Sequence, residues 1–95
     1  MRLEIINRTP LEVRLPVGVL PPEEEGVEIY LVLPLLVDME AGLVLVDMYA
    51  EALVLVMEEY GARSVGTEWG QRIELPGGGH IELAIRYDDD EDEDI

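Results

Sequence analysis

Few residues in this sequence have the types and spacings that chemistry requires. His80 is the only histidine and Ser64 the only serine, and a histidine can act as general base for a serine hydroxyl. Nothing in their spacing favours such a pair, and no Ser-His-Asp arrangement follows from the sequence. The chain contains no cysteine, which removes thiolate chemistry and cysteine-based metal sites. We therefore expect no catalytic residue, no metal and no cofactor, in a protein that is not an enzyme.

A glycine-rich segment, PGGGH at residues 76–80, could in principle hold a phosphate with its backbone N–H groups. It lacks the Lys-Ser/Thr pair that completes a P-loop, and the pattern that follows it is that of a strand and not of a helix. We interpret this segment as the connection of a β-hairpin.

Carboxylates are abundant, and one set of them is regularly spaced. Asp47 and Glu51 could together hold a divalent cation or share a proton, but they also belong to a longer series with Glu40 and Glu58, separated by seven, four and seven residues. On a helix these four side chains fall within about 40° of one another, whereas on a strand they would split between two faces. The spacing predicts one helix with a solvated acidic stripe.

The ends of this helix are predicted from capping signals. Asp38 is a good N-cap, and Gly61 suits a left-handed residue at the C-terminal end, which gives a helix over residues 38–60. A short strand at residues 43–46 is the alternative, because Gly42 costs a helix about 1 kcal/mol relative to alanine. Apart from the stripe and one further glutamate, the helix is apolar, so we expect it to be buried nearly all round.

The remaining segments have the patterns of strands. Residues 2–15 alternate around an NRTP turn and predict a hairpin, and the nearly continuous apolar run at 27–37 predicts a central strand covered on both faces. A second hairpin is predicted at 72–87, with an edge strand at 64–70 before it. The expected fold class is α+β, with an antiparallel sheet of about five strands (two hairpins plus a central strand) packed on the helix at 38–60.

The charge balance limits the partners. The sequence has 22 Asp and Glu against six Arg, no Lys and a net charge of −16, and the arginines are dispersed among acids. Nucleic acids and anionic membranes need clustered positive charge, so we expect neither as a partner. Seven acids lie in DDDEDEDI, and we predict a single domain at 1–87 followed by a disordered acidic tail at 88–95.

The sequence gives weaker indications of the location and the source of the protein. No signal-peptide pattern opens the sequence and no apolar run is suited to crossing a bilayer, so we expect an intracellular, cytoplasmic or virion protein. Ser, Asn, Gln and Thr are scarce, which favours a hot habitat over a salt-loving one, although a GC-rich coding sequence would have the same effect.

Two functions are compatible with this composition. The first is a structural or assembly protein, such as a virion (capsid or tail) component, that self-associates or packs into a larger complex. Its expected interface residues lie on the side of the helix opposite the acidic stripe or on the adjoining flank: Leu45, Tyr49, Leu53, Val56, Tyr60 and Met57. The alternative is an acidic inhibitor that imitates DNA, with the stripe Glu40, Asp47, Glu51 and Glu58 in place of phosphates.

Overall fold

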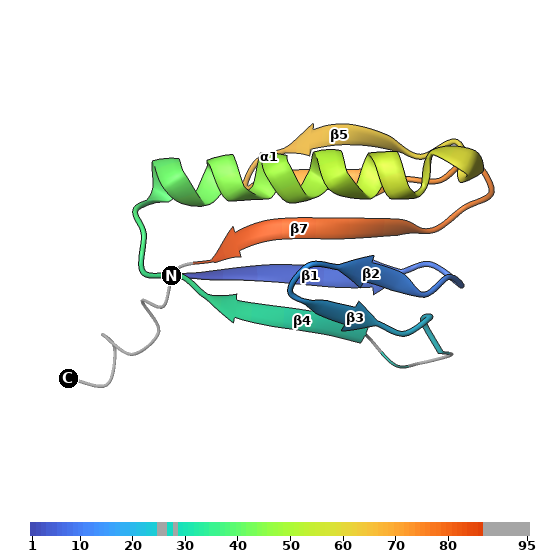
Figure 1. Ribbon diagram of the computed structural model, residues 1–95, viewed down its shortest axis with the longest axis horizontal. Coiled ribbons are helices and arrows are strands. Elements are labelled where there is room, and N and C mark those ends of the chain that lie inside the picture. Colours follow the sequence, from blue (N-terminus) through green and yellow to red (C-terminus); the bar gives the residue numbers. More distant parts are fainter. Residues whose placement is uncertain (25–26, 28, 87–95) are drawn as a thin grey trace.

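Alternating apolar and charged residues build an antiparallel sheet from strands at both ends of the chain. A computed structural model describes residues 1–24, 27 and 29–86 (Figure 1). Its elements in chain order are β1 (Arg2–Arg8), β2 (Val13–Leu15), β3 (Gly18–Leu20), β4 (Ile29–Pro34), α1 (Met39–Val56), the 3₁₀ helix η1 (Glu58–Tyr60), β5 (Arg63–Thr67), β6 (Gly70–Glu74) and β7 (His80–Arg86). The predicted α+β fold class is confirmed.

The five-stranded sheet has the order β4-β1-β7-β6-β5, and every neighbouring pair is antiparallel. Its centre is the pair β1 and β7, in which Leu3 lies opposite Ile85 and Ile5 lies opposite Leu83. These four side chains are fully or almost fully buried. The first and the last strand of the described chain therefore form the middle of the core.

One face of this sheet is covered by two elements. The helix α1 contacts β5, β6 and β7, while the small β2–β3 sheet covers the β4 side, where Gly18 lies against the side chain of Leu31 (Figure 1). Buried residues of α1, of β2–β3 and of the sheet belong to one apolar cluster. We call the opposite side of the sheet its outer face.

The helix has the predicted start and a slightly earlier end. The Asp38 carboxylate accepts a hydrogen bond from the backbone N–H of Ala41 at 2.9 Å, as an N-cap does. The α-helix ends at Val56, and a 3₁₀ turn follows it to Gly61, whose φ of 75° is left-handed. The prediction of one α-helix to residue 60 is thus too long by one turn, whereas residues 43–46 are helical as expected.

The first predicted hairpin is wrong. The strand β1 pairs with β4 and β7, while β2 pairs with β3 in a separate sheet. The reason lies in the buried side chain of Asn7, whose Nδ2 donates to the carbonyls of Leu11 and Pro21, each at 2.9 Å. Its Oδ1 accepts from Thr9, through both the backbone N–H and the hydroxyl. These bonds hold the chain as it leaves the plane of the sheet, so it does not turn back alongside β1.

The predicted central strand is also wrong in its place. The strand β4 lies at the edge of the sheet and pairs with β1 alone, and its side chains alternate between half-buried and exposed. Tyr30 and Val32 face outward, so the apolar run does not mark a strand covered on both sides. Pro34, which has no N–H to donate, suits the end of an edge strand.

The C-terminal half follows the predictions closely. The strands β6 and β7 form the second hairpin, with Ile73 opposite Ile81, and Gly78 and Gly79 in its turn have φ values of 99° and 86°. The strand β5 lies at the edge, and Trp69 lies in the turn after it. The prediction of a disordered tail at 88–95 lies outside the described residues.

Candidate interaction surfaces

Ser64 and His80 do not form a catalytic pair. The register places Ser64 opposite Ile73, on the covered face, whereas His80 lies opposite Glu74 on the outer face. The Ser64 hydroxyl lies 2.6 Å from Oε1 of Gln71, and Nε2 of His80 lies 2.9 Å from a carboxylate oxygen on its own strand. The sheet therefore separates the two side chains.

The pair Asp47 and Glu51 borders the groove between α1 and β5. The Gln71 side chain donates to Oδ1 of Asp47 at 2.9 Å and is itself bonded to Ser64, so these three residues join the helix to the edge of the sheet. Within the residues that the structure describes, no group of three or more His, Asp or Glu is arranged to hold a metal ion. Asp47 thus has a visible structural role.

The composition of α1 predicts a helix that is buried nearly all round. In the structure, much of its circumference is exposed. Only one of its faces reaches the sheet, through Gly42, Val46, Ala50 and Leu53. A two-layer domain has nothing to place above the helix, so the rest of its circumference stays open. Gly42 lies close to Ile85, where an added Cβ would be 3.3 Å from Cδ1, and this small residue lets the helix pack tightly on the sheet.

The acidic stripe lies on an exposed flank of the helix. All four of its carboxylate residues, Glu40, Asp47, Glu51 and Glu58, are exposed, as the sequence predicts. Glu40, Asp47 and Glu51 are about 100° to 140° around the helix from Val46, which points at the sheet, whereas Glu58 lies in η1 just beyond the end of α1. The stripe therefore runs along the side of α1 that borders β5.

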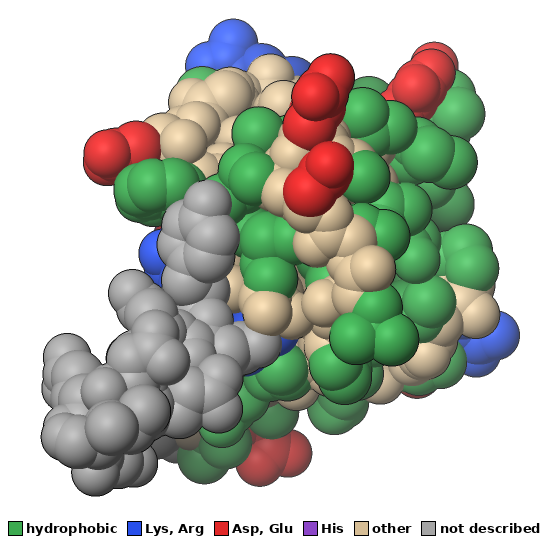
Figure 2. Space-filling model, turned by 90° about the vertical axis from the view of Figure 1, so that its left-hand side faces the viewer, with side chains coloured by type: hydrophobic (Ala, Val, Ile, Leu, Met, Phe, Trp, Pro, Cys, Tyr) green, Lys and Arg blue, Asp and Glu red, His purple; other side chains and the backbone are tan. Residues whose placement is uncertain are grey.

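An apolar ridge lies next to the stripe, on the side of α1 that points away from the sheet. Val44, Met48 and Leu55 are 54%, 60% and 66% exposed, and they lie about 160° to 200° around the helix from Val46. Figure 2 shows apolar side chains spread over the end of the molecule at which α1 begins, with acidic side chains among them. We call the ridge and the stripe together the helix-side surface.

The six residues expected to form an interface are divided between core and surface. Leu53 and Met57 are buried within the chain, and Leu45 and Tyr49 are half-buried. Val56 is exposed, and so is Tyr60 in η1. The sequence predicts an interface on the side of the helix opposite the acidic stripe. In the structure, the sheet lies to one side of that direction around the helix, and the apolar ridge lies to the other.

The outer face of the sheet concentrates positive charge. The register brings five of the six arginines to this face, on four different strands, together with three glutamates. The arginines are Arg2, Arg8, Arg63, Arg72 and Arg86, and the glutamates are Glu4, Glu74 and Glu82. Among the described strand residues, the outer face is therefore net positive in a chain whose net charge is −16.

Two of these glutamates each lie between two arginines. Nε of Arg2 and Nε of Arg86 lie 3.2 and 3.3 Å from the two carboxylate oxygens of Glu4. Arg63 and Arg72 lie 3.8 and 3.7 Å from those of Glu74. The ion pairs thus form ladders across the strands, with more cations than anions.

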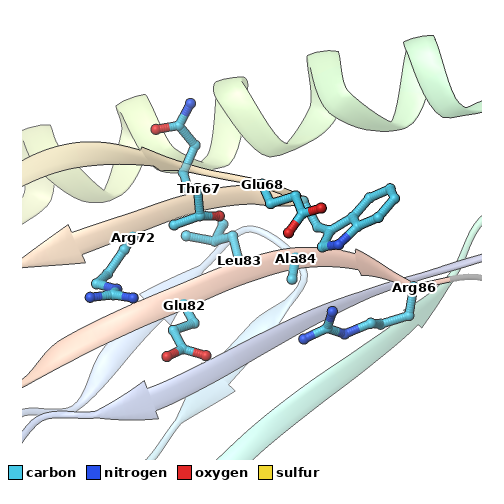
Figure 3. Close-up of a pocket in the computed structure, with 9 residues that line it drawn as sticks. Thr67, Glu68, Arg72, Glu82, Leu83, Ala84 and Arg86 are labelled. Atoms are coloured by element: carbon cyan, nitrogen blue, oxygen red, sulfur yellow. The ribbon is translucent and has the colours of Figure 1, made fainter.

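A hollow in the outer face lies beside the turn between β5 and β6. Trp69, Arg72, Glu82 and Arg86 contribute to its lining, and Figure 3 shows the side chains of Arg72, Glu82 and Arg86 on the side of the sheet away from α1. Nε of Arg72 is buried without a hydrogen-bond partner among the described residues. Because it mixes both charges around an indole ring, the hollow does not define a site for one class of small ligand.

The positive outer face was missed because the sequence separates its members. Along the chain the arginines are dispersed, and each has acids nearby. Only the alternation of the strands signals that Arg2 and Arg8, or Arg72 and Arg86, share a side with one another. The order of the strands, which the sequence did not provide, then joins these local faces into one surface.

The described residues contain no helix long and apolar enough to cross a membrane. Comparisons of this chain with protein-family models, with curated proteins and with solved structures found no match.

Proposed function

We propose that this protein is a non-enzymatic structural subunit that works by associating with copies of itself. The observation that carries the proposal is the apolar ridge, because Val44, Met48 and Leu55 are each more than half exposed on the side of α1 that the sheet leaves uncovered. Adjacent exposed apolar side chains of this kind mark interaction sites. The expected result of this association is a repeating assembly such as a shell, ring or tube, of which a virus particle is one example.

The free energy involved is appreciable for a small domain. Covering the exposed part of each ridge residue contributes on the order of 1 kcal/mol. A domain of this size has a total stability of about 5 to 15 kcal/mol, so three such residues in each copy are a substantial part of it. Association also covers the aliphatic parts of their neighbours on the same helix.

Sedimentation equilibrium of the full chain at micromolar concentration tests the proposal. We expect association that strengthens from low salt to about half-molar salt, because salt screens the repulsion between chains of net charge −16 while the apolar contact persists. A monomer at both salt concentrations, with native far-UV circular dichroism, would contradict self-association.

The alternative is an acidic protein that imitates DNA, and one observation favours it: all four carboxylates of the stripe are exposed. They share their surface with Val44, Met48 and Leu55, and duplex DNA presents about one charge per 1.7 Å with no such ridge. This alternative therefore stands second. A mimic binds a basic DNA-binding protein tightly at low salt and loses affinity steeply as salt is added, whereas a self-assembling subunit does not.

A further inference from the structure

The helix-side surface and the outer face of the sheet lie on opposite sides of the same chain. The helix packs on the covered face of the sheet with Val46, Ala50 and Leu53, and its ridge points the other way. Within the described residues, no helix or strand lies over the outer face. Each copy therefore presents two uncovered surfaces, one on each side of its two layers.

The two surfaces differ in charge. The segment from Met39 to Tyr60 contains five acids and no basic residue, and the four acids of the stripe are exposed. On the outer face, the described strand residues include five arginines against three glutamates. Opposite potentials on facing surfaces favour encounter and fix the orientation of a complex.

Apolar side chains accompany the charges on both sides. The helix-side surface has its ridge, and the outer face has Tyr30, Val32 and Val65 exposed on its two edge strands. An interface typically combines an apolar centre with polar groups around it. Each surface contains both kinds of group, with opposite signs of charge, although on the outer face the apolar side chains lie on the edge strands β4 and β5 and most of the charges lie between them.

We propose that the helix-side surface of one copy packs on the outer face of the sheet of the next copy. This inference rests on the proposed function and specifies its geometry. The contact joins two different surfaces, so it repeats from copy to copy and generates a ring if the rotation closes and a filament if it does not. Each internal sheet then has a helix on both of its faces.

Symmetric pairing of like surfaces is disfavoured by the same charges. Two helix-side surfaces face to face bring the stripes Glu40 to Glu58 of both copies together. Two outer faces bring together five arginines and three glutamates of each copy, a net positive charge on both sides. Like charges in contact cost several kcal/mol at an interface.

Two variants, each blocking one surface, test this arrangement. Met48→Arg with Leu55→Arg places positive charge on the ridge, and Arg72→Glu with Arg86→Glu places negative charge on the outer face. All four positions are at least partly exposed, so we expect the fold to be retained. Val44→Arg and Arg63→Glu serve as the second pair of variants if circular dichroism shows that either double variant is unfolded.

Matched controls lie on the small sheet β2–β3. Val17→Arg with Val19→Arg repeats the change made on the ridge at two other exposed apolar positions. Arg14→Glu reverses the one arginine that does not belong to the outer face. Both controls should associate like the parent chain.

Sedimentation velocity then separates the possible arrangements. We expect each blocked variant alone to be monomeric, with association weakened about a hundredfold. An equimolar mixture should form complexes that contain both variants, because the intact ridge of one fits the intact outer face of the other. A loss of association in only one of the two variants, or a mixture that stays monomeric, would overturn the head-to-tail arrangement. If the parent chain still self-associates in those cases, only the head-to-tail arrangement is contradicted and the proposed function is not. A monomeric parent chain would contradict both the arrangement and the proposed function.

Discussion

The two faces of the sheet are made from the same strands, yet their side chains differ in polarity and burial. In β7, Leu83 and Ile85 are buried under α1, while their neighbours Glu82 and Arg86 lie on the outer face. The buried residues of the covered face are aliphatic except for Asn7, whereas the outer face carries ion pairs over partly exposed side chains. The difference implies that the stability of the single chain comes mainly from the covered face, while the outer face contributes little to it.

The largest expected effect comes from truncating the covered face. Leu83→Ala removes a fully buried side chain from a central strand, and we expect the free energy of unfolding to fall by about 3 kcal/mol. Urea denaturation followed by circular dichroism at one fixed protein concentration measures this change. Its matched control is Glu82→Ala, the adjacent residue on the outer face, which should cost less than about 0.5 kcal/mol. Equal losses in the two variants would contradict the division between the faces.

A smaller effect is expected at Asn7, the buried polar residue of the covered face. Asn7→Ala removes the side chain that bonds Leu11, Pro21 and Thr9, so two partly buried carbonyls lose a donor and the buried Thr9 hydroxyl loses an acceptor. We expect a loss of about 2 kcal/mol in the same experiment. Glu12→Ala, an exposed position in the same region, is the control and should change stability little. A neutral Asn7→Ala would show that these bonds do not hold the chain above the sheet.

The cap of α1 has an intermediate effect. Asp38→Ala removes the hydrogen bond to the N–H of Ala41, and we expect it to cost about 1 kcal/mol. Glu51→Ala, on the exposed flank of the same helix, is the control and should lie within about 0.5 kcal/mol of the parent. A loss at Glu51 as large as that at Asp38 would mean that the stripe stabilises the fold of one chain.

The smallest effect is expected on the outer face. Glu4→Gln weakens two partly exposed ion pairs, with Arg2 and Arg86, and should change the free energy of unfolding by less than about 1 kcal/mol. The comparison to make is with Leu3→Ala, one residue earlier and fully buried, which should cost about 3 kcal/mol. A loss at Glu4 close to that at Leu3 would show that the ion pairs of the outer face stabilise the single chain.

The sequence predicted those parts of the fold whose signals are local. The second hairpin has alternating residues on both sides of a glycine-rich turn, and the stripe from Glu40 to Glu58 has the period of a helix. Each of these signals lies within about 20 residues of chain. No longer-range information was needed to find either element.

The parts that the sequence did not predict depend on long-range pairing. Leu3 lies opposite Ile85, and neither residue carries a local signal that identifies the other. An edge strand with Tyr30 and Val32 on its outer side has the same apolar run as a strand buried on both faces, so β4 was misplaced. The outer face was missed for the same reason, because it exists only once the order of the strands is known.

If the uncovered ridge of α1 mediates self-association, a dilution series of three chains detects it. Sedimentation velocity compares the parent chain with Leu55→Arg and with the control Val19→Arg, from high to low micromolar concentration at half-molar salt. Both positions are exposed and receive the same change of charge. We expect the parent chain and Val19→Arg to associate alike, while Leu55→Arg remains monomeric with native circular dichroism. Equal association of all three chains, or of none, would contradict it.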